Sequence, residues 1–336
     1  MNNLKASIAA ILLTLIAVGC SSNGTSSTPV VIPPSPPALT GSYTAGIPAS
    51  VAVSQAARGA DGRTWFTEFN SPAGDGVAAV TTAGVVTKYS TGAGSQANAI
   101  ILGPDNNIWV GGYGPGIYKI TTAGVVTPYA LAGSHIAEFT LGADNNIWFA
   151  DYGNDTIGKI TTAGVITSYP LPAGASPCGV ASGGDGNLWL TDCVNGAVDQ
   201  YSTAGALLHT YTAGLSSKGI GYIIGAPDGN LYAAEFVDQA TVGDRIVKIS
   251  TSGTLTEMPA LAPLTYPDIL TVGKDGNIYF TEYDKANLGR IIVSTGAISE
   301  FPLTLTAGDA GTEAIAPGSD GRLWLGGFSA IYALTY

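Results

Sequence analysis

Acidic side chains recur at one position of a sevenfold sequence pattern. Three residues after seven regularly spaced Trp or Tyr residues, the chain has Glu68, Gly112, Asp151, Asp192, Glu235, Glu282 and Gly327. Eleven residues before the same aromatics, the sixth and seventh copies add Asp268 and Glu313. Carboxylates that are crowded together repel one another, so they hold a cation, or have raised pKa values, or point apart into water.

We expect one acidic cluster to bind a ligand or do chemistry. Its members are Glu235, Asp268, Glu282 and Glu313. If the cluster holds a cation, Asp268 and Glu282 are the expected ligands of Mg²⁺ or Ca²⁺, although the sequence makes no cofactor certain. Tyr266, Tyr283 and Phe236 depart from the repeated aromatics and are expected either to line the same pocket or to anchor their loops. The alternative for the carboxylates is a solvated rim that accepts hydrogen bonds from loop amides.

The chain offers two histidines for acid–base chemistry. His135 is expected in a loop on the face of the acidic cluster, and a solvated loop residue is the alternative. His209 is expected on an outer strand, at the surface. No Ser-His-Asp arrangement, phosphate-binding Gly loop or Cys/His zinc spacing can be built from the sequence. The candidate catalytic residues are therefore Asp268, Glu282, Glu313 and His135.

A repeated turn sets the elements that must position these residues. It is Asp-Gly or Asp-Asn, it occurs seven times, and Trp or Tyr follows within four residues. Successive copies are 39 to 47 residues apart, a spacing typical of four-stranded propeller blades. We expect a two-residue hairpin turn whose second residue has positive φ, which Gly permits and Asn tolerates. The sequence therefore predicts an all-β fold, a seven-bladed β-propeller over residues 40–336.

The ring is expected to close through its N-terminal strand. After the last turn the chain supplies only three strands, and Thr40–Gly46 resembles His209–Gly214 of an outer strand. The N-terminal strand should therefore join the C-terminal blade, which limits exposed strand edges. The repeated aromatics are expected to pack between blades rather than bind a ligand. They are Trp65, Trp109, Trp148, Trp189, Tyr232, Tyr279 and Trp324.

Cys178 and Cys193 flank the Asp185-Gly186 turn. Strand pairing around this turn is expected to place the two side chains directly opposite each other, which favours a disulfide in an exported protein. Such a bond would contribute about 3 kcal/mol in the loop-entropy account. Two free thiols are the alternative if the domain faces a reducing compartment.

The N-terminus predicts export. Residues 1–19 have the features of a lipoprotein-type signal peptide, because Lys5 precedes an apolar run that ends in Ala17-Val18-Gly19-Cys20. Cys20 would be the lipidated first residue, and residues 20–39 would form a flexible tether rich in Ser, Thr and Pro. We expect anchoring to a bacterial membrane, on its periplasmic or extracellular face, through this lipid alone. An ordinary signal peptide on a secreted protein is the alternative.

Two blocks of sequence resemble virginiamycin B lyases, which are streptogramin lyases. They are Asp275–Glu282, preceded by Gly-Lys, and Ile157–Gly164, and the similarity covers about residues 40–336. The resemblance implies a seven-bladed propeller that opens the ester ring of B-type streptogramins by elimination. It also implies Mg²⁺, Glu residues and paired His residues that follow Pro on one face. Propellers with NHL-type repeats share the blade block, so it is specific for the fold rather than the activity.

The catalytic set of that family does not carry over. The matching Pro-His settings are Pro177-Cys178 and Pro267-Asp268 here, with Glu313 in the last blade, and none contains His. We therefore favour a ligand-binding or interaction module of the cell envelope, whose partner is a small molecule, a glycan or an envelope protein. A metal-dependent lyase or hydrolase and a structural envelope protein are the alternatives. The formal net charge of −11 argues against nucleic acid, and the closed ring is expected to be a monomer.

Overall fold

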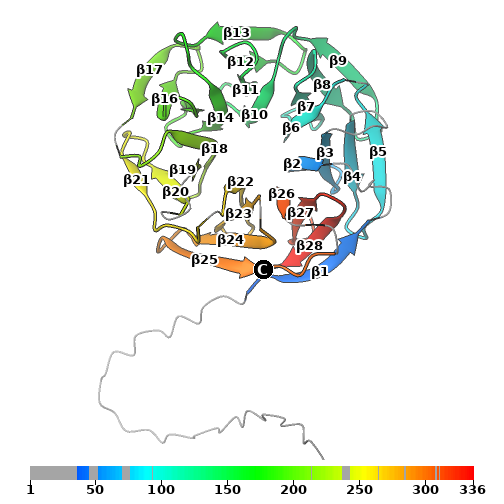
Figure 1. Ribbon diagram of the computed structural model, residues 1–336. Coiled ribbons are helices and arrows are strands. Elements are labelled where there is room, and N and C mark those ends of the chain that lie inside the picture. Colours follow the sequence, from blue (N-terminus) through cyan, green and yellow to red (C-terminus); the bar gives the residue numbers. More distant parts are fainter. Residues whose placement is uncertain are drawn as a thin grey trace, which may run out of the picture. The chain divides into compact units, whose positions relative to one another are not determined.

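The computed structural model describes residues 36–44, 52–69, 76–92, 94–212, 214–236, 243–263, 265–283, 285–306, 309 and 311–336. The predicted signal peptide, Cys20 and most of the predicted tether lie outside these residues. Within them the chain forms seven four-stranded antiparallel sheets around a ring (Figure 1), which confirms the predicted propeller. In this part of the chain no helix is long and apolar enough to cross a membrane.

The first four blades each use four consecutive strands. Blade one contains β2 (Ala52–Arg58), β3 (Thr64–Phe69), β4 (Gly76–Val80) and β5 (Val86–Ser90). Blade two contains β6 (Ala97–Leu102), β7 (Ile108–Gly112), β8 (Gly116–Ile120) and β9 (Val126–Ala130). Blade three contains β10 (Ile136–Leu141), β11 (Ile147–Asp151), β12 (Thr156–Ile160) and β13 (Ile166–Pro170). Blade four contains β14 (Pro177–Ser182), β15 (Leu188–Asp192), β16 (Ala197–Tyr201) and β17 (Leu207–Tyr211).

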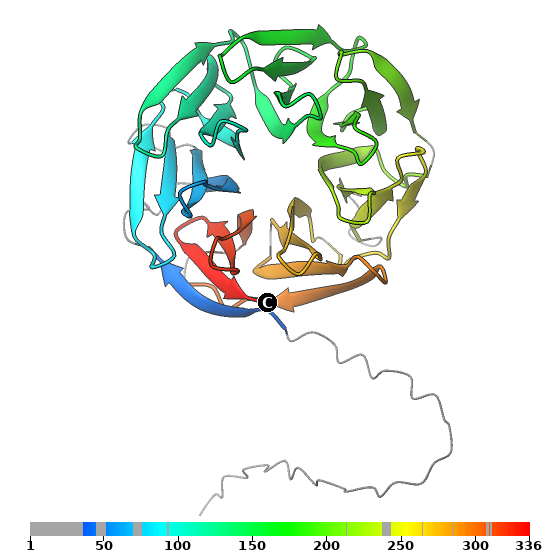
Figure 2. The ribbon, with the colours of Figure 1, turned by 180° about the vertical axis from the view of Figure 1, so that it is seen from behind.

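The last blade combines both ends of the propeller. Blade five contains β18 (Gly219–Gly225), β19 (Leu231–Phe236), β20 (Arg245–Ile249) and β21 (Leu255–Glu257). Blade six contains β22 (Pro267–Val272), β23 (Ile278–Glu282), β24 (Asn287–Ile292) and β25 (Ala297–Pro302). Blade seven contains β26 (Thr312–Pro317), β27 (Leu323–Gly327), β28 (Ile331–Thr335) and the N-terminal β1 (Ala38–Tyr43). In each blade one edge strand lies nearest the centre of the ring and the other at its rim (Figure 2).

The repeated turn joins the two innermost strands of each blade. It also forms a hydrogen bond to the repeated aromatic residue. In all seven copies the Asp carboxylate accepts a hydrogen bond from the indole N–H or phenol O–H four residues later, as Asp144 does from Trp148 at 2.9 Å. The second turn residue has positive φ in every copy, as predicted. The turn is longer than the expected two residues, because Gly142 N–H donates to Asn146 O and Asn145 N–H donates to Gly142 O. It is the three-residue hairpin loop whose last residue is left-handed.

The seven repeated aromatics are almost completely buried and pack between blades, as the sequence predicts. Trp148 of blade three, for example, belongs to the same buried hydrophobic cluster as Val180 and Leu188 of blade four. The Trp of the second strand also stacks on the Tyr of the outermost strand, with ring centroids 5.6 Å apart for Trp148 and Tyr169. These contacts bury large apolar areas at every junction, which is the main source of propeller stability.

A second contact joins each outer Tyr to the next blade. A Gly with positive φ, in the turn between the third and fourth strands, lies so close to the Tyr ring of the preceding blade that a Cβ atom would overlap it. The pairs are Gly84–Tyr43, Gly124–Tyr89, Gly164–Tyr129, Gly205–Tyr169 and Gly253–Tyr211. Gly is therefore required at this turn position for two reasons: the positive φ of its backbone and the lack of space for a Cβ atom beside the Tyr ring.

Replacing Gly164 by Ala is expected to lower the free energy of unfolding by more than about 2 kcal/mol. The positive φ alone costs about 1–2 kcal/mol with a Cβ, and overlap with Tyr129 adds about 1–3 kcal/mol. Gly229→Ala is the matched control, because Gly229 has φ +79° and no atom near its Cβ position. Denaturant unfolding should show a clearly larger loss for Gly164→Ala, and equal losses would contradict the contact.

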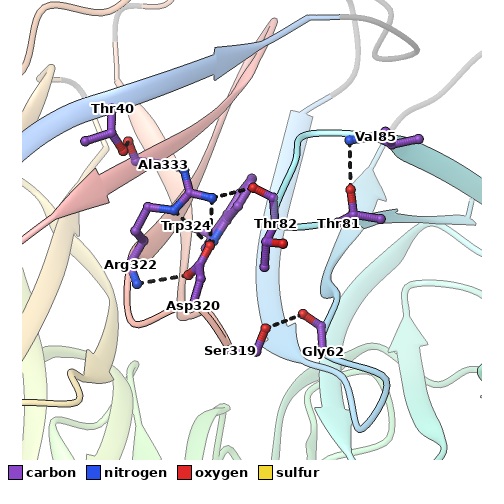
Figure 3. A network of polar contacts seen from close by, with 10 residues as sticks. All are labelled: Thr40, Gly62, Thr81, Thr82, Val85, Ser319, Asp320, Arg322, Trp324 and Ala333. Atoms are coloured by element: carbon purple, nitrogen blue, oxygen red, sulfur yellow. Dashed lines mark hydrogen bonds and ion pairs between the residues drawn. The ribbon is translucent and has the colours of Figure 1, made fainter.

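Blade seven closes the ring, as the sequence predicts. β1 pairs with β28 in an antiparallel register, and Thr40 Oγ1 donates a hydrogen bond to the Ala333 carbonyl at 3.0 Å (Figure 3). Tyr43 of β1 stacks on Trp324 with ring centroids 5.4 Å apart and meets Gly84 of blade one. The N-terminal strand thus makes the same two contacts as the outer strands of other blades. It starts at Ala38, two residues before the predicted boundary at residue 40.

Polar contacts cross the same junction between blades seven and one. Arg322 forms an ion pair with the turn Asp320 and also donates a hydrogen bond to the Thr82 carbonyl (Figure 3). Ser319 Oγ donates a hydrogen bond to the Gly62 carbonyl at 2.6 Å (Figure 3). The closure is therefore specified by directional bonds in addition to apolar packing.

Candidate functional site

Each innermost strand of the propeller has a β-bulge at the same point. In every blade the strand register shifts at the residue eleven positions before the repeated aromatic. We call these residues the inner ring: Ser54, Asn98, Ala137, Cys178, Gly221, Asp268 and Glu313. A bulge leaves a residue outside the strand pairing and re-aims its side chain. All seven line one of two adjoining cavities, with volumes of about 540 and 370 Å³.

A second set of seven residues lines the same two cavities. It lies four positions after the repeated aromatics, and we call it the outer ring: Phe69, Tyr113, Tyr152, Cys193, Phe236, Tyr283 and Phe328. Six of the seven are aromatic. The centroids of Phe69 and Tyr113 are 5.5 Å apart in an edge-to-face contact. Tyr113 and Tyr283 remain 40% and 44% exposed, so part of each side chain is open to solvent.

Of this outer ring, the sequence predicts only Tyr283 and Phe236 near a pocket. The other members could have been predicted from the sequence, because each lies four positions after a repeated aromatic residue. Tyr266, the third aromatic expected there, lines neither cavity. It has positive φ, its amide donates to Asp244 at 2.8 Å, and its carbonyl accepts from the Tyr283 amide at 3.0 Å. Tyr266 therefore has the loop-anchoring position that was its alternative.

Tyr222 spans the centre of the ring and lines both cavities. Although it belongs to blade five, its hydroxyl shares a hydrogen bond with the Gln55 side chain of blade one. Gln55 Nε2 in turn donates to the Ala137 carbonyl of blade three at 2.8 Å. This chain of contacts connects three blades beneath the pocket. No sequence pattern indicates this contact, because Tyr222 lies in the bulge of β18 and outside the repeated positions.

Glu138 lies on β10, the innermost strand of blade three, and it too was not among the predicted site residues. Its Oε2 atom accepts hydrogen bonds from the amides of Val180 at 2.9 Å and Ile223 at 3.3 Å. It lines a third cavity of about 410 Å³, nearer the Asp-Gly turns. Burial raises the pKa of Glu138 to about 8, against the effect of these two hydrogen bonds.

The two acidic members of the inner ring lie together in the smaller cavity. Burial, followed by the nearby Glu313 carboxylate, raises the pKa of Asp268 to about 8. Burial raises the pKa of Glu313 to about 7. Among the described residues, none donates a hydrogen bond or forms an ion pair with either group. The groups are thus acids poised near neutral pH, which can bind a donor or exchange a proton.

The carboxylates three positions after the aromatics line neither cavity. Several accept hydrogen bonds from loop amides, as in the alternative stated for them, but they are buried and do not form a solvated rim. Asp151 accepts hydrogen bonds from the amides of His135 at 2.8 Å and Gly153 at 3.1 Å. Glu68 forms an ion pair with Lys88 at 2.8 Å. Consecutive strand residues point to opposite sides, so a pocket lined by the fourth position excludes the third.

Glu282 and Glu235 are part of this structural set, so the expected four-membered cluster is not formed. Glu282 is fully buried, accepts a hydrogen bond from Asn287 at 2.8 Å and lies against Glu300. Burial, with Glu300 as a further cause, raises its pKa to about 8. Glu235 accepts a bond from the Ser217 amide at 3.0 Å, and burial raises its pKa to about 7. Neither residue lines the cavities with Asp268 and Glu313.

The donor set does not fit the expected Mg²⁺ or Ca²⁺ site. Asp268 and Glu282, the two expected ligands, do not line a common cavity. In the described part of the chain, no three His, Cys, Asp or Glu residues are grouped so that they could hold a metal ion. Hard divalent cations take six or more oxygen ligands, and here most of these would have to be water.

His135 lies at the edge of the pocket. Its ring contacts Tyr113 with centroids 5.1 Å apart and Tyr152 at 6.3 Å. Both tyrosines line the larger cavity, whereas His135 itself does not. His135 therefore lies in a loop beside the pocket, as predicted, but its ring contacts the aromatic wall and does not line either cavity with Asp268 and Glu313.

Cys178 and Cys193 form a disulfide in blade four, with Cα atoms 5.9 Å apart. The expected directly opposed pairing is wrong, because Cys178 falls in the bulge and has no Cα partner on the neighbouring strand. The bulge directs Cys178 into the pocket, and Cys193 follows the end of β15. The bond thus joins the inner ring to the outer ring where other blades have an aromatic residue.

The class of protein defined by this fold and site is a seven-bladed β-propeller with an aromatic-walled pocket at its centre. Comparison with known proteins assigns it more closely. The sequence profile of the virginiamycin B lyase family matches residues 41–212 and 173–330, so the chain belongs to that family. No curated protein matches the chain.

Solved structures agree with this assignment. A streptogramin B lyase structure is 26% identical with a TM-score of 0.78, over 89% of this chain and 97% of that one. The virginiamycin B lyase from Staphylococcus aureus, in a catalytically inactive His-to-Ala variant with quinupristin, is 24% identical with a TM-score of 0.79, over 90% and 100%. The WD40 propeller of Doa1 shares the fold at 10% identity and a TM-score of 0.69, over 88% and 96%.

Proposed function

We propose that this chain is a binding propeller of the virginiamycin B lyase family, which holds a ligand in the two central cavities without opening it by elimination. The observation that carries the proposal is the pair of rings. Two sets of seven equivalent positions, the inner and the outer ring, line the two adjoining cavities, and six of the seven outer positions are aromatic. A concave site with aromatic walls and a few convergent polar groups is typical of small-molecule binding.

The composition of the inner ring favours binding over elimination. The inner ring contains no His, and Cys178 is held in a disulfide, so it offers no thiolate. In the Staphylococcus aureus relative, the His-to-Ala variant is catalytically inactive and is nevertheless seen with quinupristin. A propeller of this family that lacks such a His can therefore still hold a ligand.

Tyr113→Ala is expected to weaken ligand binding by about tenfold or more, because Tyr113 lines both cavities. The measurement is a thermal-shift screen of small molecules, glycans and cyclic peptides, followed by calorimetric titration of the hits. Leu208→Ala is the matched control, since Leu208 is exposed on the outermost strand β17. Equal weakening by both variants, or no hit that depends on Tyr113, would contradict the proposed site.

We also propose that the propeller is exported and anchored through a lipid on Cys20. The signal-peptide pattern and the Ser-, Thr- and Pro-rich segment support this location. Cys20→Ser is expected to move the protein from the membrane fraction to the soluble fraction, as measured by fractionation and immunoblotting. A variant that stays with the membrane would contradict the lipid anchor.

A further inference from the structure

Asp268 and Glu313 are neighbouring carboxyl groups with no counter-charge in the described structure. Glu313 is only 9% exposed, yet it lines the smaller cavity and accepts no hydrogen bond from a described residue. Asp268 lines both cavities, and the nearby Glu313 carboxylate contributes to the raised pKa of Asp268. A nearly buried carboxylate normally has an ion-pair or hydrogen-bond partner, so this pair lacks a component.

The described part of the chain supplies no Lys or Arg to this pocket. Among the described residues that line the two cavities, none is Lys or Arg. Residues 45–51, 70–75 and 237–242, which lie outside the described residues, contain neither Lys nor Arg in the sequence. A positively charged group that neutralises Asp268 and Glu313 would therefore have to come from a ligand.

The wall around the carboxylates is aromatic. The smaller cavity is lined by Phe69, Tyr113, Tyr222, Tyr283 and Phe328 in addition to the acidic pair. Aromatic faces attract cations, most strongly where water is excluded. Ser54 and Asn98 add neutral hydrogen-bonding groups to the floor.

We propose that the ligand of this pocket is an organic cation, an ammonium group attached to an apolar or aromatic body. The ammonium group lies between Asp268 and Glu313, and the body lies against the outer ring and extends into the larger cavity. This inference rests on the proposed function, because it specifies the ligand of the same pocket.

Geometry separates this ligand from an inorganic divalent ion. The described residues hold no group of three His, Cys, Asp or Glu side chains that could bind a metal ion, so Mg²⁺ or Ca²⁺ would have to take most of its ligands from water. The cavities also have volumes of about 370 and 540 Å³, which suit an organic molecule. The aromatic walls would contribute nothing to a hydrated metal ion but would contact an alkyl or aryl ammonium directly.

The test compares two probes of similar size, phenethylamine as the cation and 2-phenylethanol as its neutral counterpart. Calorimetric titration of the full chain near neutral pH is expected to show binding of the amine about tenfold or more tighter than the alcohol. Asp268→Asn and Glu313→Gln are each expected to remove most of this preference. Asp155→Asn is the matched control, because Asp155 is exposed on the same face, lines neither cavity and makes the same change of charge. It should leave both affinities unchanged.

Three results would overturn the inference. Equal affinity for the amine and the alcohol would show that the pocket does not select a cationic ligand and binds neutral ligands equally well. If Mg²⁺ displaces the amine at a concentration lower than the amine needs for binding, the carboxylates form a metal site instead. An amine preference that Asp268→Asn and Glu313→Gln leave intact would place the cation elsewhere. If no ligand of any class binds in a Tyr113-dependent manner, the proposed function fails as well.

Discussion

Deleting residues 36–44 is expected to remove most of the stability of the propeller. These residues form β1, which supplies the outermost strand of blade seven and places Tyr43 against Trp324 and Gly84. Without β1, the edge of β28 is exposed and the junction between blades seven and one loses its aromatic contact. The loss should be comparable to the total stability of a typical domain, about 5–15 kcal/mol.

A chain that begins at residue 36 is the control, since it keeps every described contact of β1. Thermal unfolding should give a cooperative transition for this chain and a much lower or absent transition for the chain that begins at residue 45. Tyr43→Ala in the full chain provides a graded version, with an expected loss of about 2–4 kcal/mol. Equal melting temperatures for the two truncated chains would contradict closure by β1.

Asp268→Asn is expected to stabilise the folded protein at alkaline pH and to flatten its pH dependence. Burial raises the folded-state pKa of Asp268 to about 8, above its unfolded value of about 3.9. The folded state therefore prefers the protonated form, and wild-type stability falls as pH rises from about 4 through about 8. Asn stays neutral throughout, so the variant avoids this loss.

The expected gain at about pH 9 is about 1–3 kcal/mol, after allowance for solvent that reaches this partly exposed group. Glu313, Glu138, Tyr222 and Tyr113 are the titratable groups that interact with it, and none is a cation. Urea unfolding at about pH 5 and pH 9 measures the effect, with Asp155→Asn as the control. A gain that is equal at both pH values would show that Asp268 does not titrate in this range.

The architecture was predictable because its determinants are local and repeated. A turn Asp that bonds the aromatic four residues later leaves a fixed spacing in the sequence, and seven copies of that spacing define seven blades. Ring closure was also predictable, because Thr40–Gly46 resembles an outer strand and the last blade lacks one.

The site was only half predictable, because β-bulges change which residues face the centre. A regular hairpin predicts that Cys178 opposes Cys193, whereas the bulge releases Cys178 and its equivalents Asp268 and Glu313 into the pocket. Glu282 and Tyr283 are adjacent, yet only Tyr283 lines the cavity. The spacing of residues predicted the correct end of the strands, but it could not predict which of two adjacent residues faces the pocket.

Contacts between distant blades left no sequence signal at all. The hydrogen bond between Tyr222 and Gln55 joins blades five and one. Glu138 accepts hydrogen bonds from backbone amides of blades four and five. Such contacts depend on the diameter of the ring and on the bulges together. They become visible only when the blades are assembled.

The most direct test of binding without elimination is incubation of the purified protein with quinupristin, the molecule seen with the Staphylococcus aureus relative. Elimination opens the ring without changing the mass, so the products must be separated by chromatography and identified by fragmentation mass spectrometry. With Mg²⁺ present, the account predicts that the ring stays closed at every time point. A ring-opened product that forms with the wild-type protein and not with Asp268→Asn would contradict it.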